Sequence, residues 1–158
     1  KYCVGNGLDI GFGGEPIVPN AICLDRPETH PHRAVYPNPK PTHLVGDADN
    51  LLWFQDGTLD YVFSSHCLED FQDTTSVLKE WMRVIKPGGN LVLFLPDEQA
   101  HRKYVGGIGN CAHKHENFSL SYVKDILNKI GVPSKCIVHE LFPVLNNAYS
   151  FDLVVQKL

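Results

Sequence analysis

The sequence predicts a single α/β domain over residues 1–158, with an open, mostly parallel sheet of seven strands and helices on both faces. Three observations predict this fold class. Short apolar runs alternate with segments of helical period, the run 91–95 is apolar throughout, and most of the runs end in a polar residue. A continuous apolar run is typical of a strand that is buried on both faces of a parallel sheet.

The first strand, at residues 7–10, leads into a glycine-rich turn. Glycines at positions 11, 13 and 14 allow the backbone to turn sharply and to approach a ligand closely. Pro16 and Pro19 then exclude a regular helix from residues 11–20. We therefore expect an extended connection between the first and second strands, where a parallel crossover normally uses a helix.

The remaining elements follow from hydrophobic period and from helix caps. Asp73 is the predicted N-cap of one helix, which the turn 86–89 ends, and Ser119 is the predicted N-cap of another, which ends at Gly131. Residues 26–41 are rich in proline and are expected to be irregular, and residues 99–117 are expected to form a loop. The other predicted strands are 21–24, 42–45, 59–63, 91–95, 135–142 and 149–157.

Polar residues stand at the ends of the first five strands. In an open α/β sheet the carboxyl ends of parallel strands meet at one edge, and ligands bind there at the point where the strand order reverses. The sequence therefore predicts a ligand site that brings together Asp9, Asp25, Asp47, His66 and Asp97.

Composition narrows the class of ligand. A formal charge of −4, a pI near 6.0 and the absence of a basic cluster disfavour nucleic acid as the partner. No run reaches the roughly 20 apolar residues of a membrane span, and we find no signal peptide. The five cysteines are odd in number and form no CxxC pair, which indicates reduced thiols and a cytoplasmic protein. A small molecule is the expected ligand.

Five blocks of the sequence, in this order, resemble the class I S-adenosylmethionine-dependent methyltransferases: 8–13, Asp25, 46–48, 54–62 and 84–89. The resemblance covers nearly the whole chain and implies a Rossmann-like fold with S-adenosylmethionine as the cofactor. The segments 64–69 and 113–115 are similar to an uncharacterised bacterial subgroup, some members of which act in polysaccharide pathways. The subgroup implies a small-molecule acceptor, with a saccharide as one candidate.

The resemblance also implies roles for individual residues. Asp9 and the backbone of Gly11 and Gly13 match the part that holds the methionine end of the cofactor, and Asp25 matches the acid that accepts the ribose hydroxyls. The other matches are Asp47 beside the adenine amino group, Ala48 through its backbone, and Ser64 and Ser65 on the opposite wall, where the carbonyl of Ser64 faces the cofactor ammonium.

Methyl transfer from a sulfonium needs positioning above all, with a base only where the acceptor must lose a proton. His66, directly after the fourth strand, is the first candidate base, with an ordinary pKa near 6.5. An equally good alternative is that His66 holds its own loop. His113 and His115 are further candidates for contact with the acceptor, and since two ligands do not make a metal site, no metal is predicted.

The missing first helix is the departure from the family pattern, and it leaves the expected cofactor pocket open on one side. A second copy of the chain, in a homodimer, is one way to cover that side. A non-catalytic binding module that keeps the fold and acts with a partner subunit is the alternative function. A nicotinamide dehydrogenase is disfavoured, because Pro16 stands where its G-x-G-x-x-G fingerprint needs the third glycine.

Overall fold

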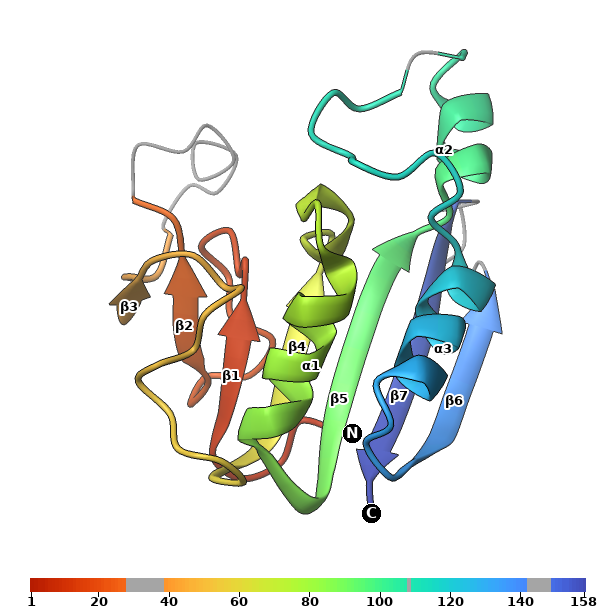
Figure 1. Cartoon of the computed structure of the whole chain (residues 1–158). Coiled ribbons are helices and arrows are strands. Elements are labelled where there is room, and N and C mark those ends of the chain that lie inside the picture. Colours follow the sequence, from red (N-terminus) through yellow and green to blue (C-terminus); the bar gives the residue numbers. More distant parts are fainter. Residues whose placement is uncertain (28–38, 108, 142–148) are drawn as a thin grey trace.

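A computed structural model of the chain describes residues 1–27, 39–107, 109–141 and 149–158. Within these ranges seven strands form one sheet in the order β3-β2-β1-β4-β5-β7-β6 (Figure 1). Neighbours among β1 to β5 pair in parallel, and β7 is antiparallel to both β5 and β6. The predicted open, mostly parallel sheet is confirmed. Its strands are β1 (Gly7–Ile10), β2 (Ile22–Asp25), β3 (Leu44–Val45), β4 (Leu59–Ser65), β5 (Ile85–Pro96), β6 (Ser134–Leu141) and β7 (Ser150–Lys157).

Two of the helices begin where the sequence predicts. Helix α1 (Thr74–Val84) is capped by Asp73, whose carboxylate accepts from the N–H of Ser76 at 3.0 Å, and α3 (Leu120–Lys129) is capped by Ser119. A short 3-10 turn, η2 (Leu68–Asp70), lies between β4 and α1.

Helix α2 (Glu98–Tyr104) was not expected, because the sequence indicates a loop from 99 to 117. Its N-cap is Asp97, which accepts from the N–H of Ala100 at 3.0 Å. Seven residues are two turns, too few for an apolar period to stand out, so only the capping contact distinguishes this helix from a loop. The start of β5 also differs from the prediction, because the strand begins at Ile85 and takes in the segment 86–89 that reads as a turn.

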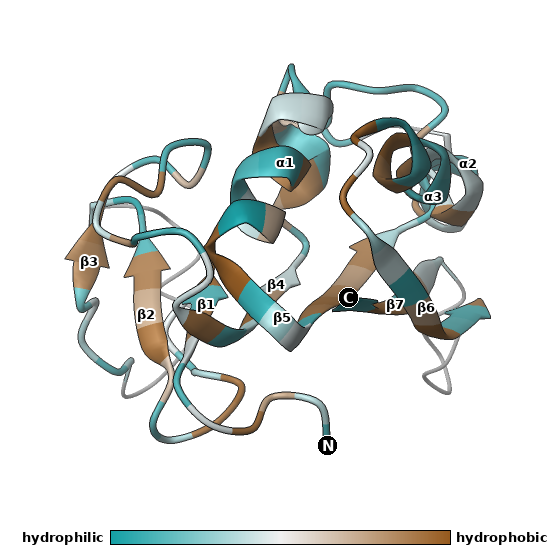
Figure 2. Cartoon of the chain, turned by 60° about the horizontal axis from the view of Figure 1, so that its bottom comes forward, coloured by the Kyte–Doolittle hydropathy of each residue, from teal (hydrophilic) through white to brown (hydrophobic). Residues whose placement is uncertain are grey.

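Both longer helices pack on the same face of the sheet (Figure 2). There the buried face of α1, with Val77, Leu78, Trp81 and Met82, shares one apolar core with Leu91, Leu93 and Leu95 of β5. In the ranges the structure describes, no helix covers the other face, although the sequence suggests helices on both. Part of that face lies under the N-terminal segment, where the amide of Asn90 donates to the carbonyl of Tyr2 at 3.2 Å.

The connection from β1 to β2 is one place where a helix on the other face of the sheet is absent. Residues 11–21, all described, contain turns and bends but no helix, as the prolines predict. The N–H of Ile17 donates to Oδ2 of Asp9 at 2.6 Å, and the carbonyl of Gly14 accepts from the N–H of Lys40 at 2.7 Å. Hydrogen bonds to β1 and to a later loop therefore hold this connection in place of helical packing.

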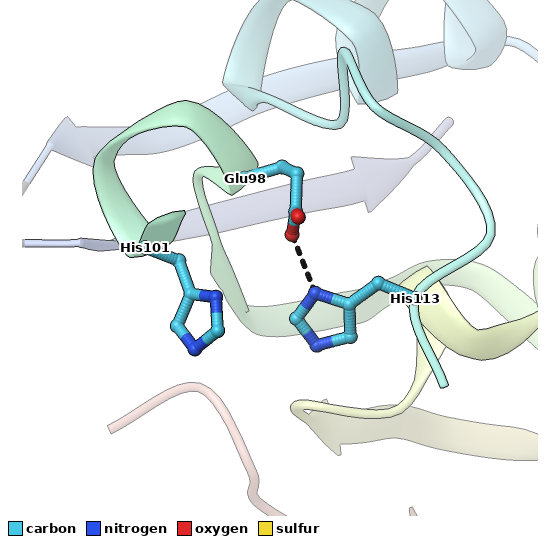
Figure 3. Close-up of side chains that lie close together, drawn as sticks. All are labelled: Glu98, His101 and His113. Atoms are coloured by element: carbon cyan, nitrogen blue, oxygen red, sulfur yellow. Dashed lines mark hydrogen bonds and ion pairs between the residues drawn. The ribbon is translucent and has the colours of Figure 1, made fainter. Parts of the chain in front are cut away.

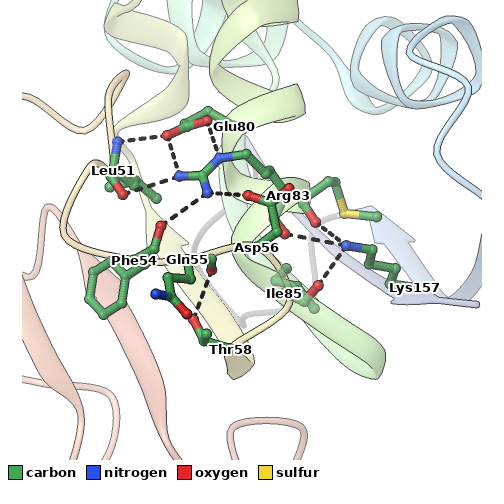
Figure 4. A network of polar contacts seen from close by, with 10 residues as sticks. Leu51, Phe54, Gln55, Asp56, Thr58, Glu80, Arg83, Ile85 and Lys157 are labelled. Carbon is green, nitrogen blue, oxygen red and sulfur yellow. Dashed lines mark hydrogen bonds and ion pairs between the residues drawn. The ribbon is translucent and has the colours of Figure 1, made fainter.

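The connection from β3 to β4, residues 46–58, is likewise irregular and is held by α1 (Figure 4). The Arg83 guanidinium donates to the carbonyls of Leu51 and Phe54 at 3.2 and 3.0 Å and to the carboxylate of Asp56 at 2.6 Å. Glu80 pairs with Arg83 and accepts from the N–H of Leu51 at 2.8 Å. This cluster, together with a 2.7 Å bond from the Trp81 indole to the carbonyl of Ala48, fixes the segment at the edge of the functional cleft described below.

Among the described residues, none of the helices has the length and apolar character needed to cross a membrane.

Candidate functional site

A cleft of about 860 Å³ opens at the carboxyl ends of β1, β2 and β4. The neighbours of β1 are β2 on one side and β4 on the other, so the cleft lies where the strand order reverses. The lining combines the glycine turn, Asp25 and Ala48 with side chains that follow β4 and β5: His66, Glu69, His101 and His113.

The glycine turn brings backbone to the cleft without side chains. Gly11 and Gly13 have φ values of 68° and 66°, and a Cβ on Gly11 would lie 3.0 Å from both Cβ and Sγ of Cys67. Only glycine fits this turn without strain. The N–H of Gly13 donates to Oδ2 of Asp25 at 3.0 Å, which joins the turn to the tip of β2.

Asp25 lines the cleft where the sequence expects it. Its two oxygens accept from the backbone N–H groups of Gly13 and Arg26, at 3.0 and 2.7 Å. A carboxylate offers about four lone-pair sites, so these two bonds orient Asp25 and leave it able to accept more.

Asp9 is buried beneath the turn, with 1% of its surface exposed. Oδ2 accepts from Ile17, whereas Oδ1 has no hydrogen-bond partner among the described residues. Burial raises the pKa of Asp9 to about 7; the Ile17 bond opposes the rise and the charge of Asp25 adds to it. A buried carboxylate oxygen without a partner, in the lining of a cleft, is a site for a cation or a hydrogen-bond donor.

Of the residues predicted to contact adenine or to form the opposite wall, some line the cleft and others do not. Ala48 and Ser65 line the cleft. Asp47 lies between the lining residues Gly46 and Ala48 and is not itself in the lining; its exposed carboxylate pairs at 3.8 Å with Arg26, which lines the cleft. Ser64 is fully buried and donates to the carbonyl of Ile10 at 3.2 Å, so the expectation that it lines the wall with Ser65 is wrong for its side chain. Successive side chains of a strand face opposite sides of the sheet, so only one of the two serine side chains reaches the cleft.

His66 lies in the cleft lining with φ of 48°, an unusual backbone conformation for a residue other than glycine. Its Nε2 is 3.2 Å from the hydroxyl of Ser150 and its Nδ1 is 3.7 Å from the carboxylate of Glu69. Burial, and then the charges of His113 and His101, lower the pKa of His66 to about 4. The ring is therefore neutral near pH 7, and the lowered pKa makes it a weaker base than a free imidazole. The backbone N–H of His66 also donates to the carbonyl of Phe94 at 3.0 Å, a bond that does not involve the ring.

His113 and His115 do not face the same way. His113 lines the cleft, and its Nδ1 lies 2.5 Å from Oε2 of Glu98. The Nε2 of His115 donates to the carbonyl of Phe71 at 2.9 Å and lies 3.0 Å from Thr74 Oγ1. The expectation that His115 faces the pocket is wrong, because the chain turns at 110–113 instead of running extended, and its ring ties the loop to the start of α1.

Glu98 and His101 join His113, and neither was among the site residues predicted from the sequence. The signal was present as Glu98-x-x-His101, a spacing that puts two side chains on one face of a helix, but His101 lay in the segment 99–117 that was predicted as a loop. Burial favours the neutral form of Glu98, yet hydrogen bonds from Arg102 and His113 hold its pKa below the usual value, so the buried carboxylate is an anion. Burial raises the pKa of the neighbouring Glu69 to about 8.

Residues 8–93 match the family described as methyltransferase domain. The chain belongs to this methyltransferase family. The match spans the glycine turn, Asp9, Asp25, Ala48, Ser65 and His66, so most of the cleft lies inside it.

Individual methyltransferases resemble the chain over shorter stretches. Norajmaline N-methyltransferase of Rauvolfia serpentina is 41% identical over 58 residues, which are 37% of this chain and 18% of that protein. Phosphoethanolamine N-methyltransferase 2 of Caenorhabditis elegans is 28% identical over 87 residues, 49% of this chain and again 18% of the relative. The matched segments are thus less than one fifth of the length of these relatives.

The crystal structure of an S-adenosylmethionine-dependent methyltransferase from Mesorhizobium loti superposes with a TM-score of 0.70 at 15% identity. It covers 99% of this chain and 93% of the other. This likeness shows the class I methyltransferase fold. The methyltransferase family implies S-adenosylmethionine, and the residues fit that cofactor: a buried, unpartnered carboxylate oxygen at Asp9, a turn without Cβ atoms, and an oriented carboxylate at Asp25.

Proposed function

We propose that this chain binds S-adenosylmethionine in the cleft and transfers its methyl group to a small-molecule acceptor. One observation carries the proposal: the buried Oδ1 of Asp9, without a partner among the described residues, lies in a cleft beside a glycine turn. The methionine end of the cofactor carries an ammonium group that complements this oxygen. An ammonium near Asp9 also lowers the cost of ionising a carboxylate whose pKa is raised to about 7.

The other contacts follow from the order of residues along the cleft. Asp25, at the tip of β2, accepts the two ribose hydroxyls as charge-assisted hydrogen bonds while Gly13 and Arg26 hold its orientation. Adenine lies against Ala48, whose position the Trp81 bond fixes, and Asp47 reaches the adenine amino group from the rim. Ser65 and the carbonyl of Ser64 form the opposite wall.

The transfer itself is a displacement in which the acceptor atom forms a bond to the methyl carbon as the bond to sulfur breaks. The sulfonium supplies an activated methyl group, so the protein contributes alignment and exclusion of water. We assign His66 as the base for an acceptor that loses a proton, because its ring is neutral and lines the cleft. His113 is the second candidate contact with the acceptor.

The polar end of the cleft supports a polar acceptor, with a saccharide hydroxyl as the class suggested by the subgroup resemblance. The similar plant and nematode proteins are N-methyltransferases by name, so an amine acceptor is the second class to assay. Free thiols at all five cysteines, which the structure describes, support a cytoplasmic location.

The uncovered side of the sheet favours a second candidate, a binding module that acts with a partner subunit and has no turnover. A second copy of the chain is the partner we propose to cover the open side. Sedimentation at several concentrations tests this association.

Calorimetry with S-adenosylmethionine and S-adenosylhomocysteine on the purified chain tests the proposed function. We expect both to bind, and Asp25→Ala to weaken binding by about 1.5–3 kcal/mol, the range for hydrogen bonds to a charged group. Asp125→Ala is the matched control, because it removes the same charge from an exposed site on α3. Failure of the parent chain to bind either ligand overturns the proposal, and binding without methyl transfer to any saccharide or amine tested supports the binding module.

A further inference from the structure

Three side chains from two segments converge beside the cleft, which His101 and His113 line: Glu98, His101 and His113 (Figure 3). Each offers one ligand atom, and the three atoms lie within 4.8 Å of one another. Glu98 is the first residue of α2, His101 lies one turn later on the same face, and His113 comes from the loop that returns toward β4. We propose that these residues bind a divalent transition-metal ion such as zinc.

The types of ligand suit such an ion. Imidazole nitrogens and a carboxylate oxygen are the donors that zinc uses, and two histidines with one glutamate form a known three-ligand set for zinc. Softer or harder ions are less suited, because the cluster has no thiolate and only one carboxylate.

The second observation concerns His101. Its Nδ1 is buried from solvent and has no hydrogen-bond partner among the described residues. Figure 3 shows the ring of His101 beside that of His113, with a nitrogen directed toward the Glu98 carboxylate. The centres of the two histidine rings are 5.2 Å apart. A buried polar atom without a partner is unfavourable, and a metal ion at this point gives it one.

Burial separates this cluster from an ordinary group of surface residues. The side chain of Glu98 is completely buried and that of His113 is 6% exposed. The other oxygen of Glu98 accepts from Nε of Arg102 at 2.6 Å, so a hydrogen bond orients the carboxylate from outside the cluster. Contacts of this kind hold metal ligands in position.

Binding requires one local change. Zinc lies about 2.1 Å from each ligand, which sets tetrahedral ligand atoms about 3.4 Å apart. Oε2 of Glu98 and Nδ1 of His113 are 2.5 Å apart across a proton, so they must separate by about 1 Å as the ion replaces that proton. His113 sits in a loop with no regular secondary structure, which can move by this amount. Protons are therefore released as the metal binds.

The location indicates what the ion contacts. His101 and His113 line the cleft, so a coordination position left open by the three ligands faces the space beyond His66. This part of the inference rests on the proposed function, since that space is where an acceptor would lie. The metal site itself does not depend on the function.

Zinc titration of the full chain, after treatment with a chelator, tests the site. We expect one equivalent to bind with a Kd in the micromolar range or tighter, with release of protons. His101→Ala should weaken binding by about tenfold or more. His139→Ala is the matched control, because His139 is exposed on β6, away from the cluster, and its loss should leave the affinity unchanged.

Cobalt gives a second readout. Co²⁺ in the parent chain should show visible absorption bands that are lost in His101→Ala, while far-UV circular dichroism shows that this variant is folded. Glu98→Gln is expected to lose binding as well, but because Glu98 is fully buried, the conclusion depends on His101. The proposal is overturned if the parent chain binds no zinc, if His101→Ala binds it as tightly as the parent, or if His139→Ala weakens binding as much. Each of these outcomes would leave Glu98 and His113 as a hydrogen-bonded pair that only holds the loop to α2.

Discussion

The backbone N–H of Ile17 donates a 2.6 Å hydrogen bond to Oδ2 of Asp9, eight residues earlier in the chain. This bond holds the connection from β1 to β2, which contains no helix. One oxygen of Asp9 thus holds the extended connection in place, and the other faces no partner among the described residues. The same side chain therefore holds a connection that no helix packs in place, and it provides the carboxylate oxygen that we propose as a partner for the cofactor ammonium.

The first prediction concerns stability and pH. The folded chain holds the Asp9 proton more tightly than the unfolded chain, with a pKa of about 7 against 3.8, so the stability from this group is complete below about pH 4 and is lost as the pH rises through 7. Asp9→Asn removes this dependence. The free energy of unfolding of the variant, relative to the parent, should rise between pH 4.5 and 8 by up to about 3 kcal/mol.

Urea unfolding at the two pH values measures the difference. His66 titrates in part of the same range but is present in both chains, so its effect cancels. Asp125→Asn, an exposed change of the same kind, should show no such dependence. The prediction would be contradicted if the free energy of unfolding of Asp9→Asn differed from that of the parent by the same amount at both pH values.

The second prediction separates backbone strain from contact at the glycine turn. Gly11 and Gly131 have nearly the same φ, 68° and 69°, but a Cβ on Gly11 meets Cys67 at 3.0 Å and a Cβ on Gly131 meets nothing within 4 Å. We expect Gly131→Ala to destabilise the chain by about 1 kcal/mol through the left-handed conformation alone. Gly11→Ala should cost clearly more, and it alone should weaken S-adenosylmethionine binding. Denaturant unfolding measures the loss of stability in each variant, and calorimetry measures the affinity for S-adenosylmethionine. Equal losses of stability in the two variants would show that the Cys67 side chain moves aside without cost.

The third prediction concerns the cluster in Figure 4. Arg83→Met leaves the carbonyls of Leu51 and Phe54 without this donor and should lower the free energy of unfolding by about 2–3 kcal/mol. Lys86→Met breaks a more exposed pair with Asp60 and should cost less than about 1 kcal/mol. Urea unfolding compares the two variants. Similar small losses would mean that the segment 46–58 holds its position without Arg83.

The fourth prediction is the ionisation of His66. From the sequence, a base at this position should titrate between about pH 6 and 7, near its ordinary pKa. The structure places the expected titration at lower pH, because burial lowers the pKa of His66 to about 4. Nuclear magnetic resonance of the ring protons, with His66→Gln to assign the signal, should therefore show a neutral ring above about pH 5. A midpoint near 6.5 would show that the ring is hydrated and free to leave the cleft.

Local features of the sequence were sufficient to determine most of the fold. Prolines 16 and 19 exclude a regular helix from residues 11–20 through their own backbone geometry, whatever the rest of the chain does. Asp73 and Ser119 begin helices through hydrogen bonds to residues only three positions away. Asp25 and His66 lie at the sheet edge because parallel strands bring their carboxyl ends together. Signals of this kind depend only on neighbouring residues in the sequence, or on the order and direction of the strands in the sheet.

Other features depend on contacts between distant segments, and only the tertiary structure decided them. The ring of His115 points to Thr74 and Phe71, more than 40 positions earlier, and that of His113 points to Glu98 across a loop. The pKa values of Asp9 and His66 depart from those of free side chains because other elements bury them. Sequence alone showed which ionisable groups the chain carries, whereas desolvation and the neighbours supplied by folding determine the charge of each and the direction in which it points.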